Sequence, residues 1–96
     1  MGREDVFCVI GAGRIGLPIS ISLTNRGQRV VILERDEERC RMINNSESPF
    51  FEKGMQEGIE RAIKNNHLTA TSDSSRIMEC NIIISAIGTG VSEDGT

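Results

Sequence analysis

The sequence predicts a single α/β domain in which about four parallel strands, in the order 3-2-1-4, carry helices on both faces. Two observations support this prediction. Short apolar runs rich in β-branched residues alternate with segments whose apolar residues recur at helical spacing. The connections between the runs are long enough for the right-handed crossovers that a parallel sheet requires. The length of 96 residues fits one domain.

A glycine-rich stretch separates the first expected strand from the first expected helix. Residues 6–10 form a short apolar run that predicts a strand, and residues 14–26 predict a helix. Gly27 follows as a natural residue for the left-handed turn that ends a helix. The apolar residues at helical spacing are Ile15, Ile19 and Leu23. The hydroxyl residues that we expect at the helix surface are Ser20, Ser22 and Thr24.

The second strand and helix follow directly. Residues 29–34, "RVVILE", are continuous enough in apolar character for a strand buried on both faces of a parallel sheet. Asp36 can cap a helix over about residues 37–44, whose first turn carries acids. A loop is expected next, because Ser48 precedes a proline and is therefore disfavoured in helical geometry.

The remaining elements complete the alternation. A helix is expected over about residues 53–65, a short strand over 68–71, a short helix capped by Asp73, and a fourth strand over 81–87. The apolar residues of the longer helix stand at i, i+4, i+7 and i+8: Met55, Ile59, Ala62 and Ile63.

Charge and hydropathy narrow the range of partners. The formal net charge is −3, and the 11 Lys and Arg residues are dispersed among acids, so no basic face for nucleic acid is indicated. The longest apolar runs, residues 6–10 and 82–87, fall far below the roughly 20 residues that span a bilayer, and no signal-peptide pattern precedes them. We expect a cytoplasmic protein without a nucleic-acid or membrane partner.

The three cysteines predict neither a disulfide framework nor a metal site. Cys8, Cys40 and Cys80 are odd in number, and none belongs to a CxxC pair. Their pattern indicates small buried residues in a reducing compartment. No metal ligand set is predicted.

The glycine loop carries the clearest functional signal. Gly11, Gly13 and Gly16 follow a predicted strand and open a helix, and Glu34 ends the next strand 18 residues later. This context is typical of a Rossmann-like dinucleotide site, in which the first glycine permits a tight turn, the second lets a pyrophosphate approach, and the third lets helix and strand pack closely. The backbone N–H groups near Arg14 and Ile15 would then face the phosphates.

The acid at position 34 bears on the choice of cofactor. Glu34 can accept hydrogen bonds from both hydroxyls of an adenosine ribose, and it disfavours a 2′-phosphate, which predicts NAD rather than NADP. Adjacent Arg35 weakens that preference. The side chain of Arg14 has two interpretations, a contact to a phosphate or substrate group and a solvated position at the helix start. Residues 1–36 alone would also suit an FAD-dependent oxidoreductase.

Later segments resemble one family. The stretches "INNSESPFFEKGM", "LTATSD" and "IIISAIGTG" fall in the order and spacing of nucleotide-sugar dehydrogenases, so the chain resembles the N-terminal NAD-binding domain of the UDP-glucose/GDP-mannose dehydrogenase family. The residues that match the family pattern are Gly11, Gly13, Gly16, Leu17, Pro18, Asn45, Ser48, Pro49, Glu52, Gly54 and Thr89. The departures are Arg14 for Tyr, Ser46 for Gly, Lys53 for Pro, and Gly90 for Pro.

The resemblance implies roles for individual residues. Glu34 replaces the ribose-binding Asp, Arg39 matches a basic residue near the adenosine ribose, and Thr89 matches a threonine that contacts the dinucleotide. A solvated helix arginine and a turn threonine are the alternatives for the last two. The implied cofactor-binding set is Gly11, Gly13, Arg14, Ile15, Gly16, Glu34, Arg39 and Thr89.

The resemblance also implies a function and its limits. Family members oxidise a UDP- or GDP-sugar to the uronate with NAD, through a thioester on a downstream cysteine, in pathways of polysaccharide biosynthesis. By this comparison residues 1–96 are a single partial domain, truncated relative to the full one. The resemblance implies that these residues do not include the central and UDP-sugar-binding domains, which the nucleotide-sugar requires. We therefore expect no turnover by this chain alone and assign no catalytic residue.

Two further expectations remain. The missing chemistry leaves open a non-catalytic NAD(H)-sensing regulatory module. The fourth strand, residues 81–87, offers an apolar edge that can template association, which predicts a homo-oligomer.

Overall fold

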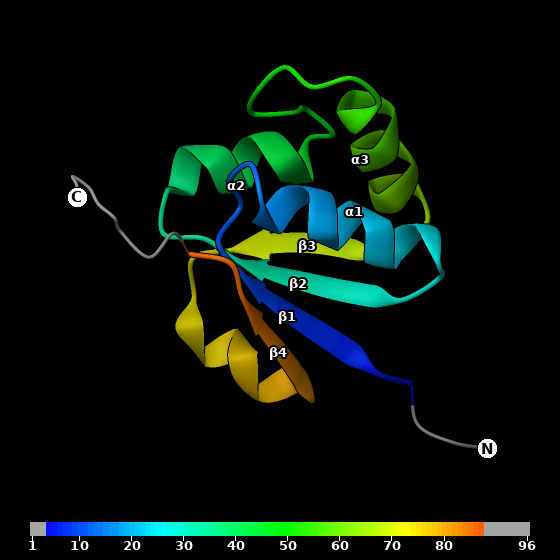
Figure 1. The fold of residues 1–96 in the computed structure, drawn as a ribbon. Coiled ribbons are helices and arrows are strands. Elements are labelled where there is room, and N and C mark those ends of the chain that lie inside the picture. The colour runs from blue at the N-terminus through cyan, green and yellow to red at the C-terminus, as the bar shows by residue number, and fades with distance from the viewer. Residues whose placement is uncertain (1–3, 88–96) are drawn as a thin grey trace.

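A four-stranded parallel sheet organises the fold (Figure 1), and the computed structural model describes residues 4–87. The strands lie in the order β3-β2-β1-β4, which confirms the predicted topology. Their bounds are β1 (Val6–Ile10), β2 (Arg29–Leu33), β3 (Leu68–Thr71) and β4 (Ile82–Ser85). All three pairings are parallel, so the carboxyl ends of the strands meet at one edge of the sheet.

Three α-helices cover one face of this sheet, and a 3₁₀ helix, η1, lies on the other (Figure 1). Their bounds are α1 (Gly16–Asn25), α2 (Glu37–Asn44), α3 (Met55–Lys64) and η1 (Ser74–Glu79). The two predicted carboxylate caps are present: the Asp36 side chain accepts from the N–H groups of Glu38 and Arg39 at 3.0 and 3.2 Å, and that of Asp73 accepts from Ser75 at 3.0 Å.

Helix α1 ends at a left-handed turn at Gly27, as predicted. Gly27 has φ +85°, and its N–H donates to the Thr24 carbonyl at 2.9 Å. The N–H of Gln28 donates to the carbonyl of Leu23 at 3.1 Å, which completes a Schellman motif. This turn sends the chain directly into β2.

The hydrophobic core lies between the sheet and the three α-helices. Alternate strand residues face it, because side chains of a strand point to opposite faces in turn. Its fully buried large side chains come from two strands and all three α-helices: Val9, Leu17, Val30, Ile32, Ile43 and Ile59. At Gly58 an added Cβ would lie 2.6 Å from Cγ2 of Ile21, so α1 and α3 pack closely.

The buried face of α1 differs in part from the periodicity that the sequence suggested. Ile15 is 62% exposed, whereas Ile19 and Leu23 are half-buried and pack against the core as expected. The helix also buries Leu17 and Ile21, which the expected spacing did not include. It also buries Ser20 and Thr24, which corrects the expected surface position of these hydroxyls. Their Oγ atoms donate to the carbonyls of Gly16 and Ile21 within the helix, at 2.9 and 3.0 Å. These two small side chains are therefore buried without unsatisfied hydroxyl groups, which apolar spacing does not reveal.

The opposite face of the sheet carries two neighbouring thiols. Cys8 is buried on β1, and Cys80 lies between η1 and β4. Burial, and next the Cys80 thiol, raise the pKa of Cys8 to about 11 from an ordinary 9.0. Burial also raises the pKa values of Cys40 and Cys80.

These shifts predict a loss of stability in alkaline solution. The unfolded chain releases its thiol protons from about pH 9, whereas folded Cys8 retains its proton until about pH 11. The free energy of unfolding should therefore fall as pH rises across that window. Urea unfolding between pH 8 and 11 measures the effect, and Cys8→Ala should flatten the dependence. An unchanged slope in that variant would contradict the assignment to Cys8.

None of the helices described between residues 4 and 87 has the length and apolar character needed to cross a membrane.

Candidate functional site

A cavity of about 600 Å³ opens at the carboxyl ends of β1 and β2. The glycine loop after β1 forms one wall, and the turn after β2 forms another. Ligands of open α/β sheets bind at this edge of the strands. The polar and charged side chains that line it are Glu34, Arg35, Asp36 and Arg39.

The three positions of the loop require glycine for three different physical reasons. Gly11 has φ +104°, and its N–H donates to the Leu33 carbonyl at 2.9 Å, which holds the turn against β2. A Cβ on Gly16 would lie 2.0 Å from the Gly11 carbonyl oxygen, so the start of α1 touches the turn directly. A Cβ on Gly13 would meet no heavy atom within 4 Å. The space in front of Gly13 is therefore open to a ligand.

The start of α1 supplies free hydrogen-bond donors. Within residues 4–87, the backbone N–H groups of Arg14, Ile15 and Gly16 have no acceptor. The helix has no side-chain cap, and its first turn has no acid. The positive end of the helix dipole and these N–H groups together favour an anion such as a phosphate.

Glu34 faces the loop from the end of β2. One carboxylate oxygen accepts from the N–H of Ala12 at 2.8 Å, and the other accepts from the N–H of Asp36 at 2.9 Å. These two bonds hold the carboxylate at the cavity wall. Each oxygen keeps further lone-pair capacity, so a diol can still be bound there.

Arg39 and Glu34 both bind the backbone of Ala12. Its Nη1 donates to the Ala12 carbonyl oxygen at 3.0 Å, while the N–H of Ala12 donates to Glu34. Both residues therefore position the loop and also line the cavity. Ala12 has no functional side chain, so the sequence offered no signal for this arrangement.

Three predicted residues within the described range do not line the cavity: Gly16, which packs against the Gly11 carbonyl, and Arg14 and Ile15. The Arg14 side chain is exposed and lies over the Phe50 ring, with its Cζ 4.8 Å from the ring centroid. Ile15 is exposed and contributes only its N–H group to the loop. Neither side chain lines the cavity. Thr89 lies outside the described residues.

Sequence reasoning did not anticipate the contact between Arg14 and Phe50. The two residues are far apart in the chain and no local pattern relates them. The second hydrogen bond of Glu34, which it accepts from the N–H of Asp36, was not predicted either, although Asp36 itself was predicted as a helix cap.

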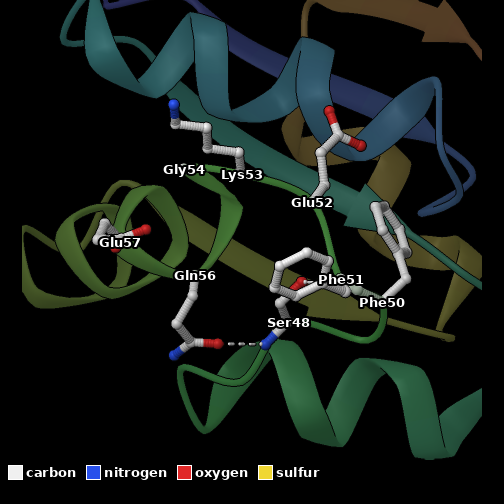
Figure 2. Close-up of a pocket in the computed structure, with 8 residues that line it drawn as sticks. All are labelled: Ser48, Phe50, Phe51, Glu52, Lys53, Gly54, Gln56 and Glu57. Atoms are coloured by element: carbon white, nitrogen blue, oxygen red, sulfur yellow. Dashed lines mark hydrogen bonds between the residues drawn. The ribbon is translucent and has the colours of Figure 1, made fainter.

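A larger cavity, of about 790 Å³, lies elsewhere, between the loop before α3 and the start of that helix (Figure 2). The Phe50 and Phe51 rings and the Gln56 side chain are among the groups that border it. Gly54, with φ +83°, also precedes an uncapped helix here, but the first turn of α3 carries Glu57, whose charge disfavours a phosphate, whereas the first turn of α1 has no acid. This cavity also lies away from the carboxyl ends of the strands. We therefore place the nucleotide site at the glycine loop.

The glycine-loop cavity fits a dinucleotide. An uncapped helix start with three free N–H groups suits a pyrophosphate, open space before Gly13 admits it, and Glu34 stands where a ribose diol would follow. Within residues 4–87 no group of three or more His, Cys, Asp and Glu side chains is placed to hold a metal ion.

Comparison with known proteins agrees with this geometry. Residues 6–96 match the family described as "UDP-glucose/GDP-mannose dehydrogenase family, NAD binding domain". The chain is 31% identical over 90 residues to the UDP-glucose 6-dehydrogenase of Pseudomonas aeruginosa, covering 93% of the chain and 20% of that protein. It is 34% identical over 88 residues to UDP-glucose 6-dehydrogenase TuaD of Bacillus subtilis, covering 91% of the chain and 19% of that protein.

Solved structures show the same fold. GDP-mannose dehydrogenase from Pseudomonas aeruginosa, in a ternary complex, matches with a TM-score of 0.86 and 21% identity, over 94% of this chain and 21% of that one. NDP-N-acetyl-D-galactosaminuronic acid dehydrogenase from Methanosarcina mazei matches with a TM-score of 0.86 and 27% identity, over 95% and 21%.

The chain spans about a fifth of the length of these relatives. Within that fifth, the match includes the glycine loop, Glu34 and the segment before α3. The chain therefore belongs to the UDP-glucose/GDP-mannose dehydrogenase family and corresponds to its NAD-binding domain.

Proposed function

We propose that this chain binds NAD at the glycine loop as the N-terminal part of a nucleotide-sugar 6-dehydrogenase, which oxidises a UDP- or GDP-sugar to the uronate. The observation that carries the proposal is the placement of Glu34 against a glycine turn whose helix start has free N–H donors. NAD supplies the hydride acceptor for such an oxidation. Family membership disfavours the flavoprotein interpretation.

Each cofactor-binding residue has a defined part in this proposal. The N–H groups of residues 14–16 bind the pyrophosphate, and the Gly13 backbone lets it approach. Glu34 accepts hydrogen bonds from the adenosine ribose, while Arg39 fixes the loop through the Ala12 carbonyl. Thr89 is proposed to contact the dinucleotide on the family resemblance alone.

The sugar chemistry is proposed for other parts of such an enzyme. The chain spans about a fifth of its curated relatives, and we assign no catalytic residue within it. We propose that the nucleotide-sugar binds to segments that correspond to the remaining length of those relatives. The uronate product would serve polysaccharide biosynthesis, and the three thiols suit a cytoplasmic enzyme.

Calorimetric titration of the 96-residue chain with NAD, ADP-ribose and NADP tests the proposal. NAD and ADP-ribose should bind with similar affinity, because the adenosine and pyrophosphate contacts carry the binding. NADP should bind more weakly, because its 2′-phosphate would meet the Glu34 carboxylate. Absence of NAD and ADP-ribose binding at millimolar ligand would refute the proposal.

We also propose that the chain forms homo-oligomers through β4. This strand is at the edge of the described sheet, and Ile83 on it is 53% exposed on the face opposite α1–α3. Exposed strand edges with apolar side chains promote association. Light scattering should show a dimer or larger species that Ile83→Lys dissociates. Replacement of Met78, which is also exposed but lies on η1, serves as the control; a monomeric wild-type chain at high concentration would exclude this proposal.

A further inference from the structure

We propose that Arg14 is a positioning residue that couples the glycine loop to the segment 45–54 through the ring of Phe50. The inference rests on the proposed function, because the glycine loop is the proposed NAD site. It assigns Arg14 an indirect part in NAD binding, in place of a direct contact between its guanidinium and a phosphate.

The Arg14 side chain points to the Phe50 ring and away from the glycine-loop cavity. Its guanidinium carbon lies 4.8 Å from the Phe50 ring centroid, and the side chain does not line the glycine-loop cavity. Among residues 4–87, no carboxylate forms an ion pair with it. The ring is therefore the partner that the structure gives to this cation, a favourable arrangement for a guanidinium over an aromatic face.

The backbone of Arg14 belongs to the glycine loop itself. Its N–H belongs to the free donors at the start of α1, and the preceding turn is held by Gly11 and Gly16. A side chain anchored on Phe50 restrains this peptide unit from the outer side. Glu34 and Arg39 restrain the same loop from the cavity side, through Ala12.

The Phe50 ring is itself fixed. Phe50 is half-buried and packs against the hydrophobic core. The backbone carbonyl oxygen of Phe50 accepts a hydrogen bond from the Ser48 hydroxyl. Gln56 on α3 clamps the same segment: its Oε1 accepts from the N–H of Ser48 at 2.9 Å (Figure 2), and its Nε2 donates to the Ser46 carbonyl at 2.6 Å. Arg14 therefore lies over a ring that is held by the hydrophobic core and by a segment bound to α3.

The next residue offers a matched control. Phe51 has the same side chain and belongs to the same segment, but it is 94% exposed and the Arg14 guanidinium does not lie over its ring. Both phenylalanines border the cavity of Figure 2. A change at Phe51 therefore alters the segment's aromatic surface without removing the contact to Arg14.

A double-mutant cycle on NAD affinity provides the first test. Arg14→Met and Phe50→Leu should each weaken NAD binding about two- to five-fold, as expected for loss of an exposed cation–π contact. The double variant should bind as weakly as either single variant and no more weakly. Phe51→Leu should bind like the wild type. A loss in Arg14→Met without one in Phe50→Leu, or additive losses, would overturn the inference and indicate a direct contact of Arg14 to the ligand.

Amide NMR of the ligand-free chain separates this inference from the proposed function. Arg14→Met should shift the amide resonances of Ser48, Phe50 and Phe51, and Phe50→Leu should shift those of residues 13–16. Shifts confined to the mutated segment would overturn the coupling. If wild-type chain binds no NAD, the proposed function fails, while these spectra still decide whether Arg14 joins the two segments.

Discussion

Gly16→Ala is expected to destabilise the chain by more than about 3 kcal/mol, a large share of the about 5–15 kcal/mol that stabilises a typical domain. The added Cβ would lie 2.0 Å from the Gly11 carbonyl oxygen and 3.2 Å from the Ala86 Cβ. The 2.0 Å contact is with backbone, so no side-chain rotation relieves it. Urea unfolding followed by circular dichroism measures the loss.

Gly13→Ala is the matched control for that experiment. It makes the same chemical change three residues earlier, where the new Cβ would meet open space. The variant should keep nearly the wild-type free energy of unfolding but bind NAD more weakly, because the methyl group occupies the space proposed for the pyrophosphate. Equal stability of the two variants would contradict the described packing of α1 on the glycine turn.

The glycines also show how far sequence reasoning reaches. The order of strands, the parallel pairing and the turn at Gly27 follow from local alternation and glycine placement, and the structure confirms them. The close packing at Gly16 was predicted as well. These features depend on short-range patterns that a single sequence carries.

Features that depend on tertiary contacts were less accessible. The spacing of Ile15, Ile19 and Leu23 predicted the core side of α1 only in part, because Ile15 is exposed while the other two pack against the core. The helix also buries Ser20 and Thr24, whose hydroxyls satisfy their hydrogen bonds within the helix. A polar residue with an internal partner resembles a surface residue in sequence. The partner of Arg14 was likewise unpredictable, because the loop that carries Phe50 comes back to the start of α1 only in the folded chain.

Glu34 combines both kinds of feature. Its position at the end of β2 and its relation to the glycine loop were predictable from spacing. Its use of both carboxylate oxygens to bind the N–H groups of Ala12 and Asp36 was not. Substitution of Glu34 therefore changes loop geometry as well as ligand contacts, and a binding experiment has to separate the two.

Glu34→Ala is expected to weaken NAD binding by about 1–3 kcal/mol, through loss of two ribose hydrogen bonds. It should also lower the free energy of unfolding by about 1–2 kcal/mol, because two N–H groups lose their acceptor. Calorimetry well below the unfolding temperature gives the first value, and urea unfolding gives the second.

Glu34→Asp distinguishes the two contributions, since it keeps a carboxylate but shortens its reach. If Glu34 binds the ribose, the aspartate variant should retain more NAD affinity than Glu34→Ala. The preference for NAD over NADP should be strongest in the wild type, weaker in Glu34→Asp and weakest in Glu34→Ala. A 2′-phosphate meets less negative charge when the carboxylate is removed or withdrawn. Unchanged NAD affinity in Glu34→Ala, together with reduced stability, would instead show that the carboxylate serves only to hold the glycine loop.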